Sequence, residues 1–125
     1  MIVERLAGTA TTGLWITMRE RHHTDPADVD LPMLMHALSD PLRLEIVDIL
    51  DRQGEMACAA VCHDLSIGKS NASHHFRVLR ESGVVLSRTS GRDAYVSLRM
   101  QELDRYFPDL LPAVLATFRR QAVTA

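Results

Sequence analysis

The sequence predicts a mainly α-helical fold that carries a small β-hairpin. Four segments place apolar residues at helical spacing between cap and stop residues, and a fifth, near the C-terminus, is long and amphipathic. Two short runs, β-branched or alternating, flank the tight-turn sequence SGRD. At 125 residues with 46% hydrophobic content, the chain favours one compact domain with a modest core.

The composition narrows the class of protein. Two cysteines do not make a disulfide framework and no stretch has the pattern of a secretory signal, so we expect a cytoplasmic protein with reduced thiols. No apolar run approaches the roughly 18 to 20 residues that span a bilayer, which predicts a soluble protein without a membrane partner. With 5% aromatic residues, the chain has few rings on which single-stranded nucleic acid could stack.

The chain divides into two parts of different character. Residues 1–29 have short apolar patches without a sustained period and then a polar, turn-rich stretch, which predicts an N-terminal extension. Met18 precedes the polar stretch. It is either the natural start of translation or, if translation starts at Met1, an ordinary methionine in a short helix. Residues 30–122 carry the periodic segments and form the predicted domain.

Cap residues define the first two helices. Asp30 can cap a helix over residues 31–38 that tolerates Pro32 in its first turn and whose apolar positions are Leu34, Met35 and Leu38. Ser39 or Asp40 can cap a second helix, which stops at Gly54. Its predicted apolar face is Leu42, Ile46, Ile49 and Leu50.

A short helix and a polar helix follow across a tight turn. The Ala-rich stretch MACAAVCHDL fits a third helix over residues 57–65, which the sequence SIG ends before a fourth helix over 69–82. Ala72, Phe76 and Leu79, with Val78 beside them, are predicted to face the core, and Gly83 ends the helix. The positions left on the outside are Lys69, Ser70, Asn71, Ser73, His74, Arg77 and Arg80.

The hairpin and one amphipathic segment complete the domain. VVLSRT and AYVSLR form the two strands and place an arginine at the tip. The final segment is predicted to be long and amphipathic and to be bent by Pro108 and Pro112. Its apolar positions are Leu103, Tyr106, Phe107, Leu110, Leu111, Val114, Leu115 and Phe118. A small monomer could not cover all of the apolar surface of the last part of this segment, which predicts a homodimer. The residues concerned are Leu110, Leu111, Val114, Leu115 and Phe118.

Helix, helix, tight turn, polar helix and basic hairpin is the order typical of a winged helix-turn-helix. The whole chain carries 14 Lys+Arg and 16 Asp+Glu, a formal net charge of -2. Residues 66–99 nevertheless hold six cations and two anions, a local charge of +4, which leaves -6 on the rest. Basic charge is therefore concentrated where a DNA duplex would be met.

The exposed side chains of the polar helix suit the reading of bases. Ser70, Asn71 and Ser73 are small enough for close approach, Asn can bond adenine bidentately, and Arg77 lies on the same side. Arg88 and Arg92 in the hairpin would reach the backbone or minor groove. The alternatives are a merely solvated helix face and a winged helix that contacts only proteins.

Two stretches resemble the ArsR/SmtB family of bacterial winged-helix repressors. ALSDPLRLEIVDIL, residues 37–50, is similar to the helix that leads into the family's helix-turn-helix, and KSNASHHFRVLRESGVV, residues 69–85, is similar to its recognition helix and first wing strand. The resemblance implies a homodimer, paired through the first and last helices, that represses its own operon until an inducer weakens DNA binding. It also implies that His75 packs against the neighbouring helix, and it assigns the DNA contacts to Lys69, Ser70, Asn71, Ser73, His74 and Arg77.

The inducer site does not follow the family pattern. Many family members carry Cys-x-Cys entering the third helix or Asp and His ligands on the last helix, whereas Cys58 and Cys62 here are four apart and residues 101–125 contain no His or Cys. Three interpretations of the two thiols stay open. They are a soft-metal site completed by His22, His23 or His63, an oxidant-sensitive pair, or structural cysteines that need no cofactor.

Enzymatic chemistry is not predicted. Cys62, His63 and Asp64 are neighbours in sequence, and neighbours on a helix diverge by about 100°, so they cannot form a catalytic relay. The sequence SIGKSN lacks the glycine spacing of a phosphate-binding P-loop. The expected partners are a duplex DNA operator and a second copy of the chain.

Overall fold

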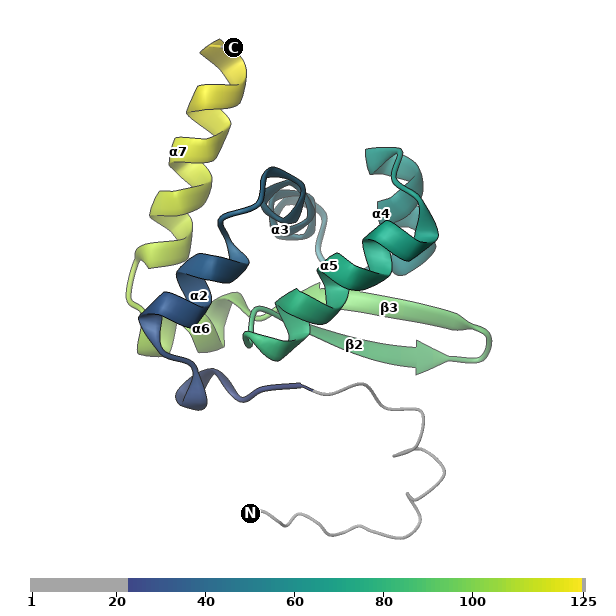
Figure 1. Ribbon diagram of the computed structural model, residues 1–125, viewed down its shortest axis with the longest axis horizontal. Coiled ribbons are helices and arrows are strands. Elements are labelled where there is room, and N and C mark those ends of the chain that lie inside the picture. Colours follow the sequence, from purple (N-terminus) through teal and green to yellow (C-terminus); the bar gives the residue numbers. More distant parts are fainter. Residues whose placement is uncertain (1–22, 125) are drawn as a thin grey trace, which may run out of the picture.

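Helices cover one side of a small antiparallel sheet in the computed structural model, which describes residues 23–124 (Figure 1). The hairpin extends past the helices at one end of the molecule, and α7 stands at the other. The elements in chain order are η1 (Pro26–Asp28), α2 (Leu31–Ala37), α3 (Pro41–Gln53), β1 (Met56–Ala57), α4 (Cys58–Leu65), α5 (Lys69–Glu81), β2 (Val85–Ser90), β3 (Asp93–Leu98), α6 (Met100–Tyr106) and α7 (Leu110–Thr124). The mainly α-helical fold with one hairpin is confirmed.

Side-chain caps fix the starts of α2 and α3. Asp30 Oδ1 accepts a hydrogen bond from the Met33 amide at 2.9 Å, and Asp40 Oδ2 accepts from the amides of Leu42 and Arg43 at 2.9 and 3.1 Å. Asp40, rather than Ser39, is therefore the cap of α3. At its other end, Gly54 takes a φ of 82°, which a side chain would disfavour, and closes the helix as predicted.

The structure refines the prediction for α2 in two details. The helix ends at Ala37, and Leu38 is its C-cap. Met35, which was predicted at helical spacing with Leu34 and Leu38, is 47% exposed, whereas Leu34 and Leu38 are buried. Residues three and four apart share a helix face, and Met35 lies about 100° from Leu34, so the core takes the face that carries Leu34, Ala37 and Leu38.

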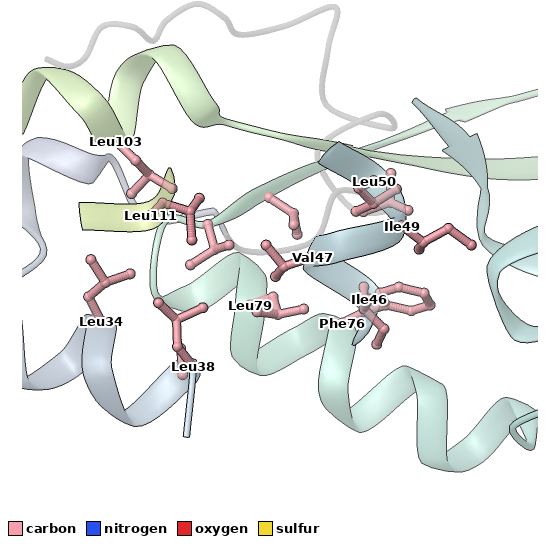
Figure 2. Packing of buried hydrophobic residues seen from close by; sticks show 14 of the residues in the cluster. Leu34, Leu38, Ile46, Val47, Ile49, Leu50, Phe76, Leu79, Leu103 and Leu111 are labelled. Carbon is pink, nitrogen blue, oxygen red and sulfur yellow. The ribbon is translucent and has the colours of Figure 1, made fainter. Parts of the chain in front are cut away.

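One apolar cluster joins the helices to the sheet. Figure 2 shows Leu79 of α5 and Val47 of α3 near its centre, with side chains from α2, α6 and α7 beside them. Each large side chain that is fully buried contributes about 1.5 to 3 kcal/mol of transfer free energy. The fully buried leucines, isoleucine and valines are Leu34, Ile46, Val47, Leu50, Val61, Leu79, Val84, Val85, Val96, Leu103 and Leu115.

The sheet has three strands in the order β1-β3-β2. Strand β2 pairs with β3 from Val85 opposite Leu98 to Ser90 opposite Asp93, so Gly91 and Arg92 form the turn and an arginine does lie at the tip. Strand β1 was not predicted, because residue 57 was assigned to the third helix and residue 56 to no element. Two residues are too few to show a period in sequence, and their pairing with β3 is a tertiary contact.

The C-terminal segment consists of two helices, α6 and α7. Asp109 takes a φ of 64° between α6 and α7, and Pro108 beside it prevents a continuous helix. Pro112 lies in the first turn of α7, where its missing N–H disturbs no helical hydrogen bond, so it does not bend the helix. Leu111 and Leu115 are buried, and Tyr106 is 45% exposed.

Residues 23–29, which the sequence analysis assigned to the extension, pack on the domain. Pro26 and Val29 are buried, and the Thr24 amide donates to the Arg80 carbonyl at 3.2 Å. Gly83 makes room for this segment: its φ is 77°, and a Cβ there would lie 3.0 Å from Val29 Cγ2. The folded body therefore begins before residue 30. The expectations for the rest of the extension, including the start at Met18, lie outside the described residues.

Across residues 23–124, no helix has both the length and the apolar character needed to cross a membrane.

We expect Leu79→Ala to lower the free energy of unfolding by about 2 to 5 kcal/mol, because it leaves a cavity among α3, α5 and β2. Denaturant unfolding followed by circular dichroism measures the change. Leu86→Ala is the matched control, since Leu86 is 40% exposed on the hairpin and should cost far less. Equal losses for the two variants would contradict the assigned core.

Candidate nucleic-acid interface

Helix α5 has one buried and one exposed face. Ala72, Phe76 and Leu79 are buried in the core, as the periodicity predicted. The six side chains predicted to contact DNA from this helix are all exposed: Lys69, Ser70, Asn71, Ser73, His74 and Arg77. The helix therefore presents a continuous polar and basic face. The small side chains on it, Ser70, Asn71 and Ser73, lie in the first turns.

Arg80 was predicted on the exposed side and is buried, at 8% exposure. It follows Phe76 by four residues and Ala72 by eight, so it shares their helix face. There it lines a small cavity of about 150 Å³ between α5 and the hairpin, together with Ser73 and Ser87. The prediction failed because charge was taken as a sign of exposure, whereas a long arginine can bury its apolar stem.

The start of α5 is open to an external acceptor. Gly68 is its N-cap, and no side chain caps the helix. Ser66 closes α4 in the left-handed conformation, with a φ of 55°, and so turns the chain directly into α5. Uncapped amides at a helix start carry partial positive charge and bind phosphate oxygens. They lie beside exposed Lys69, which reinforces this charge.

His74 and Arg77 are linked on the exposed face. Arg77 Nη2 lies 3.2 Å from His74 Nδ1, one helical turn away. A guanidinium only donates hydrogen bonds, so in this contact the His74 nitrogen accepts. The pair restricts the rotamers of Arg77 before any partner arrives.

Arg88 on strand β2 is held by an acidic side chain. Its Nε and Nη2 donate to the two carboxylate oxygens of Glu55 at 2.9 and 2.8 Å, and its guanidinium lies 4.7 Å from the centre of the Tyr95 ring. This hydrogen bonding lowers the pKa of the Glu55 carboxyl. Glu55 was not predicted as part of the site, because 33 residues separate it from Arg88 and no local pattern links them.

Arg92 occupies a different place in the hairpin. It is exposed in the two-residue turn between β2 and β3, at the end farthest from α6 (Figure 1). Arg88 instead follows Ser87, which faces α5, and successive strand residues point to opposite sides of a sheet. Of the two hairpin arginines, Arg92 is thus at the tip and Arg88 on the outer sheet face.

Cys58 and Cys62 are half-buried and line one groove of about 680 Å³ between α4 and the hairpin tip, together with Lys69 and Arg92. Within residues 23–124 no three His, Cys, Asp or Glu side chains gather as a metal site would require. His63 lies against Asp64 at 3.5 Å, and His23 Nε2 accepts from the Ser87 amide at 2.9 Å. The third candidate, His22, lies outside the described residues, so the metal site stays a prediction.

Comparison with known proteins agrees with this architecture. Residues 38–88 match the family described as helix-turn-helix domain. The chain is 40% identical over 79 residues to the uncharacterized HTH-type transcriptional regulator YceK of Bacillus subtilis, covering 62% of this chain and 79% of that protein. It is 31% identical over 75 residues to the arsenical resistance operon repressor of Staphylococcus xylosus, covering 60% and 71%.

Among solved structures, the transcriptional repressor BigR of Xylella fastidiosa superposes with a TM-score of 0.58 at 28% identity, covering 70% of this chain and 85% of that one. The fold and the polar helix thus define a helix-turn-helix transcriptional regulator, a non-enzymatic class as the sequence predicted. The chain belongs to the ArsR/SmtB family of winged-helix repressors.

We expect Arg88→Ala to raise the pKa of the Glu55 carboxyl toward its ordinary value of 4.5, because the hydrogen bond that stabilises its charged form is lost. NMR titration of the side-chain carboxyl carbons measures this pKa. Arg92→Ala is the matched control, since it removes a hairpin arginine without touching Glu55. A Glu55 pKa that stays low in Arg88→Ala would refute the assigned pair.

Proposed function

We propose that the protein is an autoregulated, homodimeric repressor that reads a specific duplex site with α5 and is released by an inducer. The observation that carries this proposal is the division of α5 into a buried apolar face and an exposed face of small polar and basic side chains with an uncapped start. A helix of this kind fits the major groove, which is wide enough for it and carries a unique pattern of donors and acceptors.

The exposed residues take different roles in this proposal. Lys69 and the first amides of α5 bind phosphate, which positions the helix. Ser70, Asn71 and Ser73 reach base edges from the first turns, and Arg77, held by His74, reads a base from the third. Arg92 at the hairpin tip contacts the backbone or the minor groove.

Arg88 can contact DNA only if its pairing with Glu55 changes. To bind a phosphate it must leave Glu55 or share its donors with both groups. While Arg88 pairs with Glu55, its positive charge is offset, so the hairpin has fewer unpartnered charges to attract DNA of arbitrary sequence. We therefore place Arg88 among the DNA contacts with a smaller share of the affinity than Arg92.

The dimer is proposed through α2 and α7, which lie at the end of the molecule away from the hairpin tip (Figure 1). Leu31 and Met35, one turn apart on α2, are 50% and 47% exposed, and Met33 is 42% exposed. On α7 the half-buried apolar residues are Leu110, Val114 and Phe118. Leu111 and Leu115, which the sequence analysis counted toward this surface, are buried within the monomer.

A two-fold dimer of this kind would match a roughly palindromic operator with half-sites about one DNA turn apart. The inducer remains proposed by family resemblance. The groove that holds Cys58 and Cys62 also contains Lys69, so a signal that changes the thiols would act at the start of α5.

We expect Arg77→Ala to weaken binding to the operator by about 1 to 3 kcal/mol and to relax sequence preference, because it removes a base contact. Arg92→Ala should weaken binding to all sequences alike and flatten the salt dependence. Gel-shift titration on the DNA upstream of the gene, at several salt concentrations, separates the two effects. Arg105→Ala on α6 is the control for loss of an exposed cation outside the interface. No retardation by the wild type at low salt would overturn the proposed function.

We expect the wild type to sediment as a dimer at micromolar concentration, because its exposed α2 side chains are unfavourable in water. Met35→Lys should shift the equilibrium to the monomer, since it places a charge in the proposed interface. Leu86→Lys, at a similarly exposed leucine on the hairpin, should leave the dimer intact. A stable wild-type monomer in analytical ultracentrifugation would refute the dimer.

A further inference from the structure

A buried arginine joins three helices behind the recognition helix. Arg43 lies in the first turn of α3 and is 7% exposed. Its Nε donates to the Ala37 carbonyl at 2.7 Å and its Nη2 to the His36 carbonyl at 3.2 Å, both at the end of α2. Its Nη1 lies 3.1 Å from Nδ1 of His75, in the middle of α5. One guanidinium thus connects α2 and α3 to the helix that we propose reads DNA.

The contact between Arg43 and His75 fixes the protonation state of the histidine. A guanidinium has donors and no acceptor, so Nδ1 of His75 must present its lone pair to Nη1. The neutral ring then carries its proton on Nε2. Since His75 is 8% exposed and α5 bears it on the side opposite the DNA-facing residues, this contact anchors the helix rather than touching DNA.

Protonation of His75 would turn the contact from attraction into repulsion. A second proton on Nδ1 removes the acceptor and places two buried cations about 3 Å apart. Burial, Arg43 and His74 oppose the charged ring, and the Asp40 carboxylate, 3.9 Å from Nδ1 at the cap of α3, favours it. The opposing effects are larger, so the pKa of His75 lies below its ordinary value of 6.5.

We propose that Arg43 and His75 are positioning residues for DNA recognition, whose contact holds α5 in its binding orientation and is broken when His75 gains a proton. This inference rests on the proposed function, because it assumes that α5 enters the duplex. The predicted consequence is a repressor that loosens its recognition helix and binds its operator more weakly in acid.

The direction of the effect follows from linkage. The pKa of His75 is depressed in the anchored state, so the loosened state binds the proton more readily. The anchored state is therefore fully favoured above pH 6.5 and becomes less favoured as the pH falls below that value. A group with an ordinary pKa of 6.5 can shift this equilibrium by at most about tenfold at pH 5.5.

The decisive variant is His75→Asn, in which the amide oxygen can take the place of Nδ1 and accept from Arg43 without titrating. Operator affinity is measured by fluorescence anisotropy at pH 7.5, 6.5 and 5.5 at constant ionic strength. We expect the wild type to lose up to about tenfold in affinity from pH 7.5 to 5.5 and His75→Asn to lose less than about twofold. His63→Asn, which removes an exposed histidine on α4, should keep the wild-type pH response.

The outcomes separate this inference from the proposed function. Failure of the wild type to bind at pH 7.5 would reject the function itself, whereas parallel pH responses of the wild type and His75→Asn would reject only the positioning pair. If His75→Asn does not fold, ¹⁵N NMR of the wild-type ring decides. A proton on Nε2 and a pKa below 6.5 are expected, and a proton on Nδ1 or a higher pKa would overturn the proposal.

Discussion

The packing around α3 holds the helices and the sheet together. Its residues 46 to 50 are buried without interruption, so all sides of this part of the helix are covered. The elements that cover it include α4, α5, α7 and β3. Asp48 is the charged member of that run, and a buried carboxylate must be paired to be tolerated. It accepts hydrogen bonds from Arg119 of α7 and from Arg52 one turn along α3, while Arg119 also donates to Asp51.

Helix α3 therefore connects two surfaces for which we propose different functions. On one side the Arg43 contact holds α5, and on the other the Asp48 and Arg119 pair fixes the rotation of α7. Because interior packing is dense, a shift of α7 is transmitted to α3 and its neighbours rather than absorbed. This arrangement gives the proposed dimer interface a physical route to the recognition helix.

Local rules predicted the features that depend on neighbouring residues, and tertiary contacts decided the others. The Asp40 cap, the Gly54 stop and the buried stripe of α5 follow from spacings of a few residues. Strand β1 exists only because β3 lies beside it, and Arg80 is buried only because the hairpin covers that face of α5. Within the candidate site, exposure of the α5 residues was predictable from helix period, but the Glu55 pairing that engages Arg88 was not, since 33 residues separate the two.

The bond from the Ser87 amide to His23 has a consequence for how the protein behaves in concentrated solution. Strand β2 lies at the border of the sheet, where outward-facing amides can pair with a strand of another molecule and start aggregation. His23 takes up one of these donors with its own ring, and the Thr24 amide ties the same segment to the end of α5. The residues that lead into the domain thus shield its vulnerable border, and removing them would favour edge-to-edge association even if every helix kept its place.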